Sequence, residues 1–129
     1  MVIDTSAVLA ILQDEPERPR FTEAIAGAAQ RSMSVATLLE AAIVVEARFG
    51  VEGGRYLDQL LERAGVEVVA VDEEQVRIAR DAYRRFGRGQ HPAGLNFGDC
   101  LSYALAQVRH QRLLFKGDDF AQTDVAPVI

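Results

Sequence analysis

The sequence predicts a three-layer α/β/α fold built on a short central parallel sheet. Short β-branched segments alternate with longer segments whose apolar residues recur at helical spacing. This alternation is typical of a parallel sheet that is covered by helices on both faces. The 129 residues contain no repeat, linker or low-complexity segment, so we expect one domain over residues 1–129.

The N-terminal half is expected to contain two strands and four helices. They are a strand at residues 2–3, helices at 7–12 and 21–29, a strand at 31–34, and helices at 35–49 and 56–63. Asp4 and Ser34 each precede a helix, as capping residues do. Pro16 and Pro19 are expected to separate the first two helices. The glycines of residues 50–54 are expected to separate the helix at 35–49 from the helix at 56–63.

The C-terminal half continues the alternation. We expect a strand at residues 66–71, a helix at 73–86, a loop at 87–94, a helix from the Asn96 cap to about residue 108, and short strands at 113–115 and 125–129. Residues 66–71 are rich in valine and alternate as a strand does. The loop, GRGQHPAG, has the Gly, Pro and Arg content of a mobile segment beside a functional site.

Composition narrows the function classes. The chain is 49% hydrophobic and 26% charged, as soluble globular proteins are, and its net charge of −5 argues against binding polyanions through bulk charge. The lone cysteine, Cys100, excludes an internal disulfide, and no apolar segment has the length of a membrane span. With no signal peptide at the start, we expect a cytoplasmic protein.

Carboxylates recur at the edges of apolar segments or inside them. Asp4 follows the first strand, Glu40 interrupts SVATLLEAAIVV, Asp99 lies in LNFGDCLSYALA, and Asp118 and Asp119 lie in LLFKGDDF. Acids after parallel strands meet at one edge of the sheet, where they repel one another unless a divalent cation neutralises them. Mg²⁺ or Mn²⁺ suits such oxygen ligands and can activate water for attack on a phosphodiester.

Each of these acids also has a simpler interpretation. Asp4 alone is well explained as a helix cap. Asp99 lies three residues after Asn96, where an acid favours the helix dipole. Asp118 and Asp119 are common types of turn residue.

Glu40 is harder to explain in this way. Its neighbours one helical turn away are largely apolar, and an acid on such a face is seldom left without a partner. Pairing with Arg48 or Arg109 is the structural alternative to a functional role. Taken together, the ordered acids favour a metal-dependent hydrolase.

The ordered motifs VIDTSAVLAIL, Glu40, LNFGDCLSYALA and LLFKGDDFAQTDV resemble those of PIN-domain ribonucleases, and more narrowly the VapC toxins of VapBC toxin–antitoxin pairs. The resemblance covers essentially the whole chain. It implies a PIN-like fold and an Mg²⁺-dependent endoribonuclease, with Mn²⁺ as a substitute, that cleaves cellular RNA such as tRNA or rRNA. It also implies a homodimer and inhibition by a VapB-type antitoxin.

The resemblance also assigns roles to individual residues. Asp4 and Asp99 match the most direct metal ligands, and Glu40 matches a further ligand or an orienter of metal-bound water. Asp119 is favoured over Asp118 as the fourth acid. Three other positions match supporting residues: Thr5, Ser6 and Asn96. A variant without the first charge, Asp4→Asn, is expected to be inactive and to fold as well as the wild type or better.

The sequence indicates the surfaces that bind RNA or protein partners less clearly than it indicates the acidic site. Candidates for RNA contacts are the cations near the loop and the last acidic motif: Arg84, Arg85, Arg88 and Lys116. Candidates for dimer or antitoxin grooves are Leu38, Leu39, Leu57, Leu60 and Leu61. For each of these cations taken singly, a solvated surface position is the better interpretation. For each leucine, ordinary core packing is at least as good an interpretation as a partner groove.

Other function classes fit less well. A haloacid-dehalogenase phosphatase would need a second Asp where Ser6 stands, and a receiver domain would need an acidic pair after the first strand. The remaining alternative is a catalytically silent regulatory protein that pairs with an antitoxin-like partner. Because all four acidic positions are filled, the sequence disfavours it.

Overall fold

A computed structural model describes residues 1–129 and contains a four-stranded parallel sheet. The strands are β1 (Val2–Ile3), β2 (Ser32–Ser34), β3 (Glu67–Val69) and β4 (Leu113–Leu114), in the order β3-β2-β1-β4. All three strand pairs are parallel, which confirms the predicted fold class. The strand expected at residues 125–129 is reduced to a single bridge between Leu113 and Pro127.

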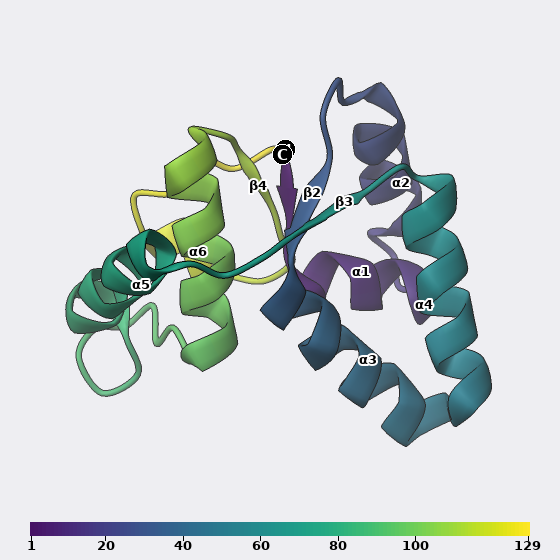
Figure 1. The fold of residues 1–129 in the computed structure, drawn as a ribbon, viewed down its shortest axis with the longest axis horizontal. Coiled ribbons are helices and arrows are strands. Elements are labelled where there is room, and N and C mark those ends of the chain that lie inside the picture. Colours follow the sequence, from purple (N-terminus) through teal and green to yellow (C-terminus); the bar gives the residue numbers. More distant parts are fainter.

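Six α-helices connect and flank the strands (Figure 1). They are α1 (Thr5–Leu12), α2 (Arg18–Gly27), α3 (Val35–Phe49), α4 (Val51–Arg63), α5 (Glu73–Phe86) and α6 (Phe97–Arg109), and a 3-10 turn, η1 (Phe120–Gln122), follows β4. The side chains of Asp4, Ser34 and Asn96 cap α1, α3 and α6, as their positions predicted. No helix is both long enough and apolar enough to cross a membrane.

The helices form two layers with separate hydrophobic cores. Helices α5 and α6 lie on one side of the strands and α1 to α4 on the other (Figure 1). Neighbouring residues of a strand point to opposite faces, so Val2 and Leu113 pack against α6 while Ile3 and Leu114 pack against α1 and α3. The strands therefore lie between two helical layers, each packed on its own hydrophobic core.

Two boundary predictions were wrong for identifiable reasons. Gly53 and Gly54 lie inside α4 instead of interrupting the chain. A Cβ at Gly53 would lie 2.6 Å from the Val45 carbonyl oxygen, and one at Gly54 would lie 2.5 Å from Glu46 Oε1, so both glycines permit the close packing of α4 on α3. Pro19 lies in the first turn of α2, where its missing N–H costs no hydrogen bond.

Candidate active site

Asp4 lies at the carboxyl end of β1 and is almost completely buried, with 3% of its surface exposed. The backbone N–H of Ser6 (3.0 Å) and its hydroxyl (2.7 Å) both donate to Asp4 Oδ2. The hydroxyl of Ser102 donates to Asp4 Oδ1 at 2.6 Å. A buried carboxylate is costly without such donors, so the surrounding chain holds this one in a fixed orientation.

Two hydroxyl residues at this site were not recognised from the sequence. Ser102 in α6 and Thr37 in α3 are buried, and their hydroxyl oxygens lie 3.0 Å apart. Their spacing was an available signal, since Ser102 lies three residues after Asp99 and Thr37 three residues before Glu40. Thr5, expected to support Asp4, instead donates its hydroxyl to the Thr37 carbonyl at 3.3 Å.

Asp99 lies in the first turn of α6 and is half-buried. It forms a capping box with Asn96, whose backbone N–H donates to Asp99 Oδ2 at 3.0 Å. Burial, opposed by the hydrogen bond from the Asn96 N–H and assisted by the negative charges of Asp4, Glu40 and Asp119, raises the pKa of Asp99 to about 6. The structure therefore brings Asp4, Glu40 and Asp119 within electrostatic range of Asp99.

Glu40 extends from α3 to the start of α6. A Cβ at Gly98 would overlap the Glu40 carboxylate, so the absence of a side chain at position 98 leaves the space that this carboxylate occupies. Glu40 makes no ion pair: Arg48 bonds to Gln13, and Arg109 bonds to Glu67. The structural alternative considered for Glu40, pairing with either arginine, is therefore not what the structure contains.

Asp118 and Asp119 follow β4 and are both exposed. The side chain of neither accepts a hydrogen bond, and Asp119 precedes the short helix η1 without capping it. Asp119 contributes to the raised pKa of Asp99, whereas Asp118 is not among the charges that do so. Of the two residues, Asp119 is thus the one whose charge acts on Asp99.

The donor set fits a small divalent cation that keeps part of its water shell. No three Asp, Glu, His or Cys side chains lie close enough to form a complete metal centre from the protein alone. Mg²⁺ needs only one or two direct carboxylates, because waters and substrate phosphate oxygens fill the other positions. The negative charges that repel Asp99 are of the kind that such an ion neutralises.

The four candidate RNA-binding cations differ in their surroundings. Arg85 is paired with Asp124 at 2.9 Å and with Asp81 at 3.5 Å, and the Lys116 ammonium is paired with Glu15 and Glu17. Arg84 and Arg88 are exposed and form no ion pair. Arg88 lies in the loop that joins α5 to α6, and Figure 1 shows this loop projecting beside the start of α6.

An exposed aromatic residue at the same end of α6 was also missed. Phe97 is the first residue of α6, and 81% of its surface is exposed, more than for any other large hydrophobic residue of the chain. Only its position inside the acidic motif LNFGD, two residues before Asp99, could have drawn attention to it.

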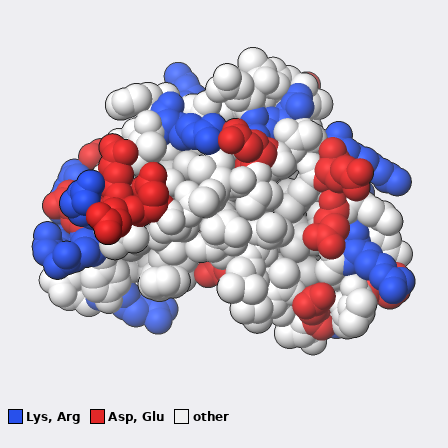
Figure 2. Space-filling model, viewed as in Figure 1, with Lys and Arg blue, Asp and Glu red and all other residues white.

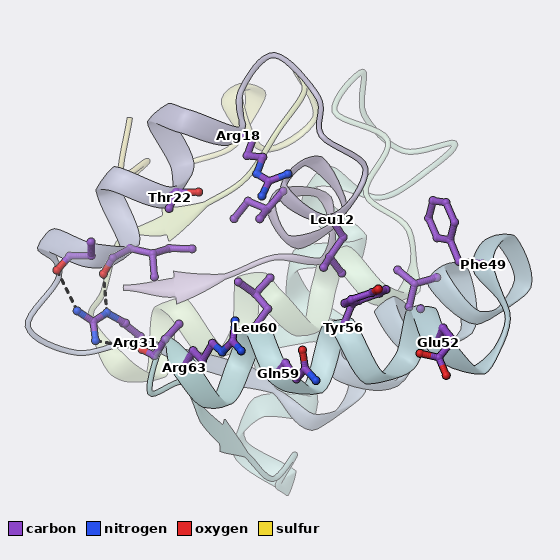
Figure 3. A pocket seen from close by; sticks show the side chains of 16 residues that line it. Leu12, Arg18, Thr22, Arg31, Phe49, Glu52, Tyr56, Gln59, Leu60 and Arg63 are labelled. Carbon is purple, nitrogen blue, oxygen red and sulfur yellow. Dashed lines mark hydrogen bonds between the residues drawn. The ribbon is translucent and has the colours of Figure 1, made fainter.

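A groove lies on the opposite layer, between α1, α2 and α4. It has a volume of about 940 Å³ and an apolar floor that includes Leu12, Ile25 and Leu60. Figure 3 shows Arg31 at one end of this groove, held by backbone carbonyls, and Phe49 and Tyr56 toward the other end. Of the leucines proposed for partner grooves, Leu60 lines this one, whereas Leu57 and Leu61 are buried in the core.

Comparisons with known proteins identify the family of the chain. The model of the PIN domain family matches residues 1–126. A ribonuclease VapC of Mycolicibacterium smegmatis is 59% identical over 128 residues, which cover 99% of each chain. Ribonuclease VapC30 of Mycobacterium tuberculosis is 56% identical over 128 residues, which cover 99% of this chain and 98% of the relative.

Solved structures show the same fold. The crystal structure of Mycobacterium tuberculosis VapC20, a sarcin-ricin loop cleaving toxin, matches 97% of this chain and 95% of its own with a TM-score of 0.79 at 16% identity. The crystal structure of VapBC2 of Rickettsia felis, bound to a promoter DNA fragment, matches 98% of this chain and 94% of its own with a TM-score of 0.76 at 13% identity. From the family match and the full-length identity to curated relatives, the chain belongs to the PIN-domain family and, within it, to the VapC ribonucleases of toxin–antitoxin systems.

Proposed function

We propose that this VapC ribonuclease is an Mg²⁺-dependent endoribonuclease that cleaves cellular RNA, tRNA or rRNA, and is neutralised by a VapB-type antitoxin. The observation that carries the proposal is the electrostatic coupling of Asp99 to Asp4, Glu40 and Asp119 at the carboxyl end of the parallel sheet. When bound, Mg²⁺ or Mn²⁺ would supply charge neutralisation at the phosphate and an acidified water.

The chain's own residues have separate tasks in this proposal. Asp4 and Asp99 hold the ion, Asp4 from a rigid position and Asp99 from the first turn of α6. Glu40 and Asp119, whose charges both act on Asp99, orient water or a second ligand shell in this proposal. Asp118 remains the alternative to Asp119, and Ser6 and Asn96 fix the two principal acids by hydrogen bonds.

Substrate contacts are expected on the open side of the site. Phe97 offers an exposed ring on which an unpaired RNA base can stack. Arg84 and Arg88 are the unpaired cations next to this region and suit phosphate contacts. Arg85 and Lys116 would first have to leave their carboxylate partners.

The groove between α1, α2 and α4 suits an apolar segment of the antitoxin. Its apolar floor offers hydrophobic burial, and the Arg63 guanidinium at its edge has no carboxylate partner in the chain, which favours an acidic residue beside that segment. A basic antitoxin residue would separately match the acidic cluster by charge.

A second surface suits the expected homodimer. Val35, Leu39 and Ile43 are spaced by four residues along α3 and are 45%, 61% and 59% exposed. Figure 2 shows a broad area without charged side chains between two charged margins on this side of the molecule. An apolar helix face of this kind is typical of protein–protein contacts.

The test is cleavage of total RNA and of a tRNA pool by purified protein with Mg²⁺, Mn²⁺ or EDTA. Discrete fragments that require the metal and disappear in Asp99→Asn would support the proposal. Asp58→Asn is the matched control, since Asp58 is an exposed acid of α4 that makes no ion pair. Cleavage that persists in EDTA, or in Asp99→Asn, would contradict it. If the wild type neither binds the metal nor cleaves, the silent regulatory protein becomes the better interpretation.

A further inference from the structure

A buried pair of hydroxyl groups lies directly beneath the acidic site. Ser102 is 0% exposed, Thr37 is 1% exposed and Asp4 is 3% exposed. These three side chains come from α6, α3 and the end of β1, so they meet where both helical layers contact the sheet. Each helix contributes an acid, Asp99 or Glu40, and a hydroxyl one turn away from it on the same face.

The direction of the hydrogen bonds in this pair follows from the groups present. An ionised carboxylate only accepts, so the single hydroxyl hydrogen of Ser102 is donated to Asp4 Oδ1 at 2.6 Å. In the 3.0 Å contact between Ser102 and Thr37, the Thr37 hydroxyl must therefore be the donor. The result is a directed chain from Thr37 through Ser102 to Asp4.

The two oxygens of Asp4 are not equally occupied. Oδ2 accepts from the Ser6 N–H and from the Ser6 hydroxyl, whose own oxygen accepts from the Lys116 backbone N–H at 3.0 Å. Each carboxylate oxygen offers about two acceptor positions, so Oδ2 is filled within the chain. Oδ1 accepts only from Ser102 and retains one position.

From this geometry we infer that Ser102, oriented by Thr37, is a positioning residue that sets the rotation of the Asp4 carboxylate and directs the open position of Oδ1 to a divalent cation. The inference rests on the proposed function, in which Asp4 binds metal. A simple packing role does not account for the pair. Alanine and valine would fill the same interior without burying polar groups, and the directed chain ends on the Asp4 carboxylate.

The experiment measures Mn²⁺ binding by calorimetry and RNA cleavage for Ser102→Ala and Thr37→Val. Ser102→Ala is expected to weaken Mn²⁺ binding by about 10- to 100-fold, as loss of a hydrogen bond to a metal ligand typically does. It should lower kcat and leave the KM for RNA unchanged. Thr37→Val keeps the side-chain volume and is expected to have a smaller effect of the same kind. In the Ser102→Ala background it should add nothing, because the chain of hydrogen bonds passes through Ser102.

Controls separate this role from simple stability. Ser32→Ala removes another buried serine hydroxyl, one whose hydrogen bond goes to the Met1 carbonyl, and should leave Mn²⁺ affinity unchanged. Ser102→Cys keeps the volume with a weaker donor, so it tests the inference if the alanine variant does not fold. Wild-type Mn²⁺ affinity and kcat in Ser102→Ala or Ser102→Cys would overturn the positioning role alone. Absence of Mn²⁺ binding by the wild-type protein would overturn the proposed function and the positioning role with it.

Discussion

Asp4 and Asp99, the two acids proposed to hold the metal, lie in opposite environments. Asp4 is buried, and three hydrogen bonds from Ser6 and Ser102 stabilise its carboxylate. Asp99 accepts one backbone hydrogen bond, and burial together with the charges of its neighbours raises its pKa to about 6. The folded chain thus stabilises one charge of the site by itself and leaves the other to be neutralised by a cation or a proton.

Loss of either charge is expected to have the largest effect on catalysis. Asp4→Asn and Asp99→Asn should each lower the single-turnover cleavage rate at least about 10³-fold, which corresponds to about 4 kcal/mol of lost transition-state stabilisation. The rate is measured on a defined RNA at saturating Mg²⁺. Retention of more than about a tenth of the wild-type rate by either variant would remove that acid from the catalytic set.

The same two variants should differ in sign when stability is measured without metal. Asp99→Asn is expected to raise the free energy of unfolding at pH 7 by about 1–2 kcal/mol, because it removes a repelled charge from a partly exposed position. Asp4→Asn is expected to lower it by about 1–3 kcal/mol, because the hydrogen bonds that now reach a carboxylate are weakened. This revises the expectation from the sequence that Asp4→Asn would be neutral or stabilising.

Urea denaturation in EDTA measures both effects. The Asp58→Asn control should lie within about 0.5 kcal/mol of wild type, as surface substitutions usually do. Equal destabilisation by Asp4→Asn and Asp99→Asn would show that the two environments are not distinct.

The pH dependence of stability gives a sharper measure of Asp99. Its pKa is raised in the folded chain from 3.8 to about 6, so between these values the folded state binds more protons than the unfolded state. The contribution of Asp99 to stability is therefore greatest below about pH 4 and falls as the pH rises through 6. Groups with lowered pKa values, such as Asp124 and Glu67, act in the opposite direction.

Subtracting the Asp99→Asn curve from the wild-type curve removes the contributions of those other groups. In metal-free buffer, wild type should lose about 1–2 kcal/mol relative to the variant between pH 4 and pH 7. Saturating Mg²⁺ should restore much of this loss at pH 7. A difference that does not change with pH would contradict the raised pKa.

The sequence predicts Asp4 and Asp99 as acids of the site but does not predict their different environments. The bounds of α3 and α5 followed from apolar spacing and capping residues, and the parallel sheet followed from the alternation of strands and helices. Hydrogen bonds over long separations, such as the one from Ser102 to Asp4, depend on how two helices cross a strand, and local patterns do not encode that crossing. For the same reason, the local sequence predicts breaks at Gly53 and Gly54, because the close packing of α4 on α3 that requires these glycines is a tertiary contact.

Substrate contacts should concentrate on the Asp99 side, which is the open half of the site. Phe97→Ala is expected to raise the KM for RNA by about 5- to 100-fold if a base stacks on the ring, and Phe97→Trp should preserve binding. Phe49→Ala is the matched control, an exposed phenylalanine in the groove on the other layer, and should leave this KM unchanged. An unchanged KM in Phe97→Ala would contradict base stacking and would favour a role for the Phe97 ring in a contact with a protein partner.

The smallest effects are expected from substitutions of the arginines. These substitutions compare the unpaired Arg84 and Arg88 with the paired Arg85, which lies on the same helix as Arg84. Combined Arg84→Ala and Arg88→Ala substitutions should weaken RNA binding by a few-fold and flatten its dependence on salt, because each unpaired guanidinium that contacts a phosphate releases about one counterion. Arg85→Ala should instead lower stability by up to about 1 kcal/mol, since it breaks the ion pair with Asp124. Binding measured between 50 and 300 mM salt, as rough limits, separates the two cases. A flatter salt dependence for Arg85→Ala than for the double variant would contradict this assignment. It would show that an RNA phosphate displaces Asp124 from Arg85, so that the ion pair holds Arg85 in place until the substrate binds.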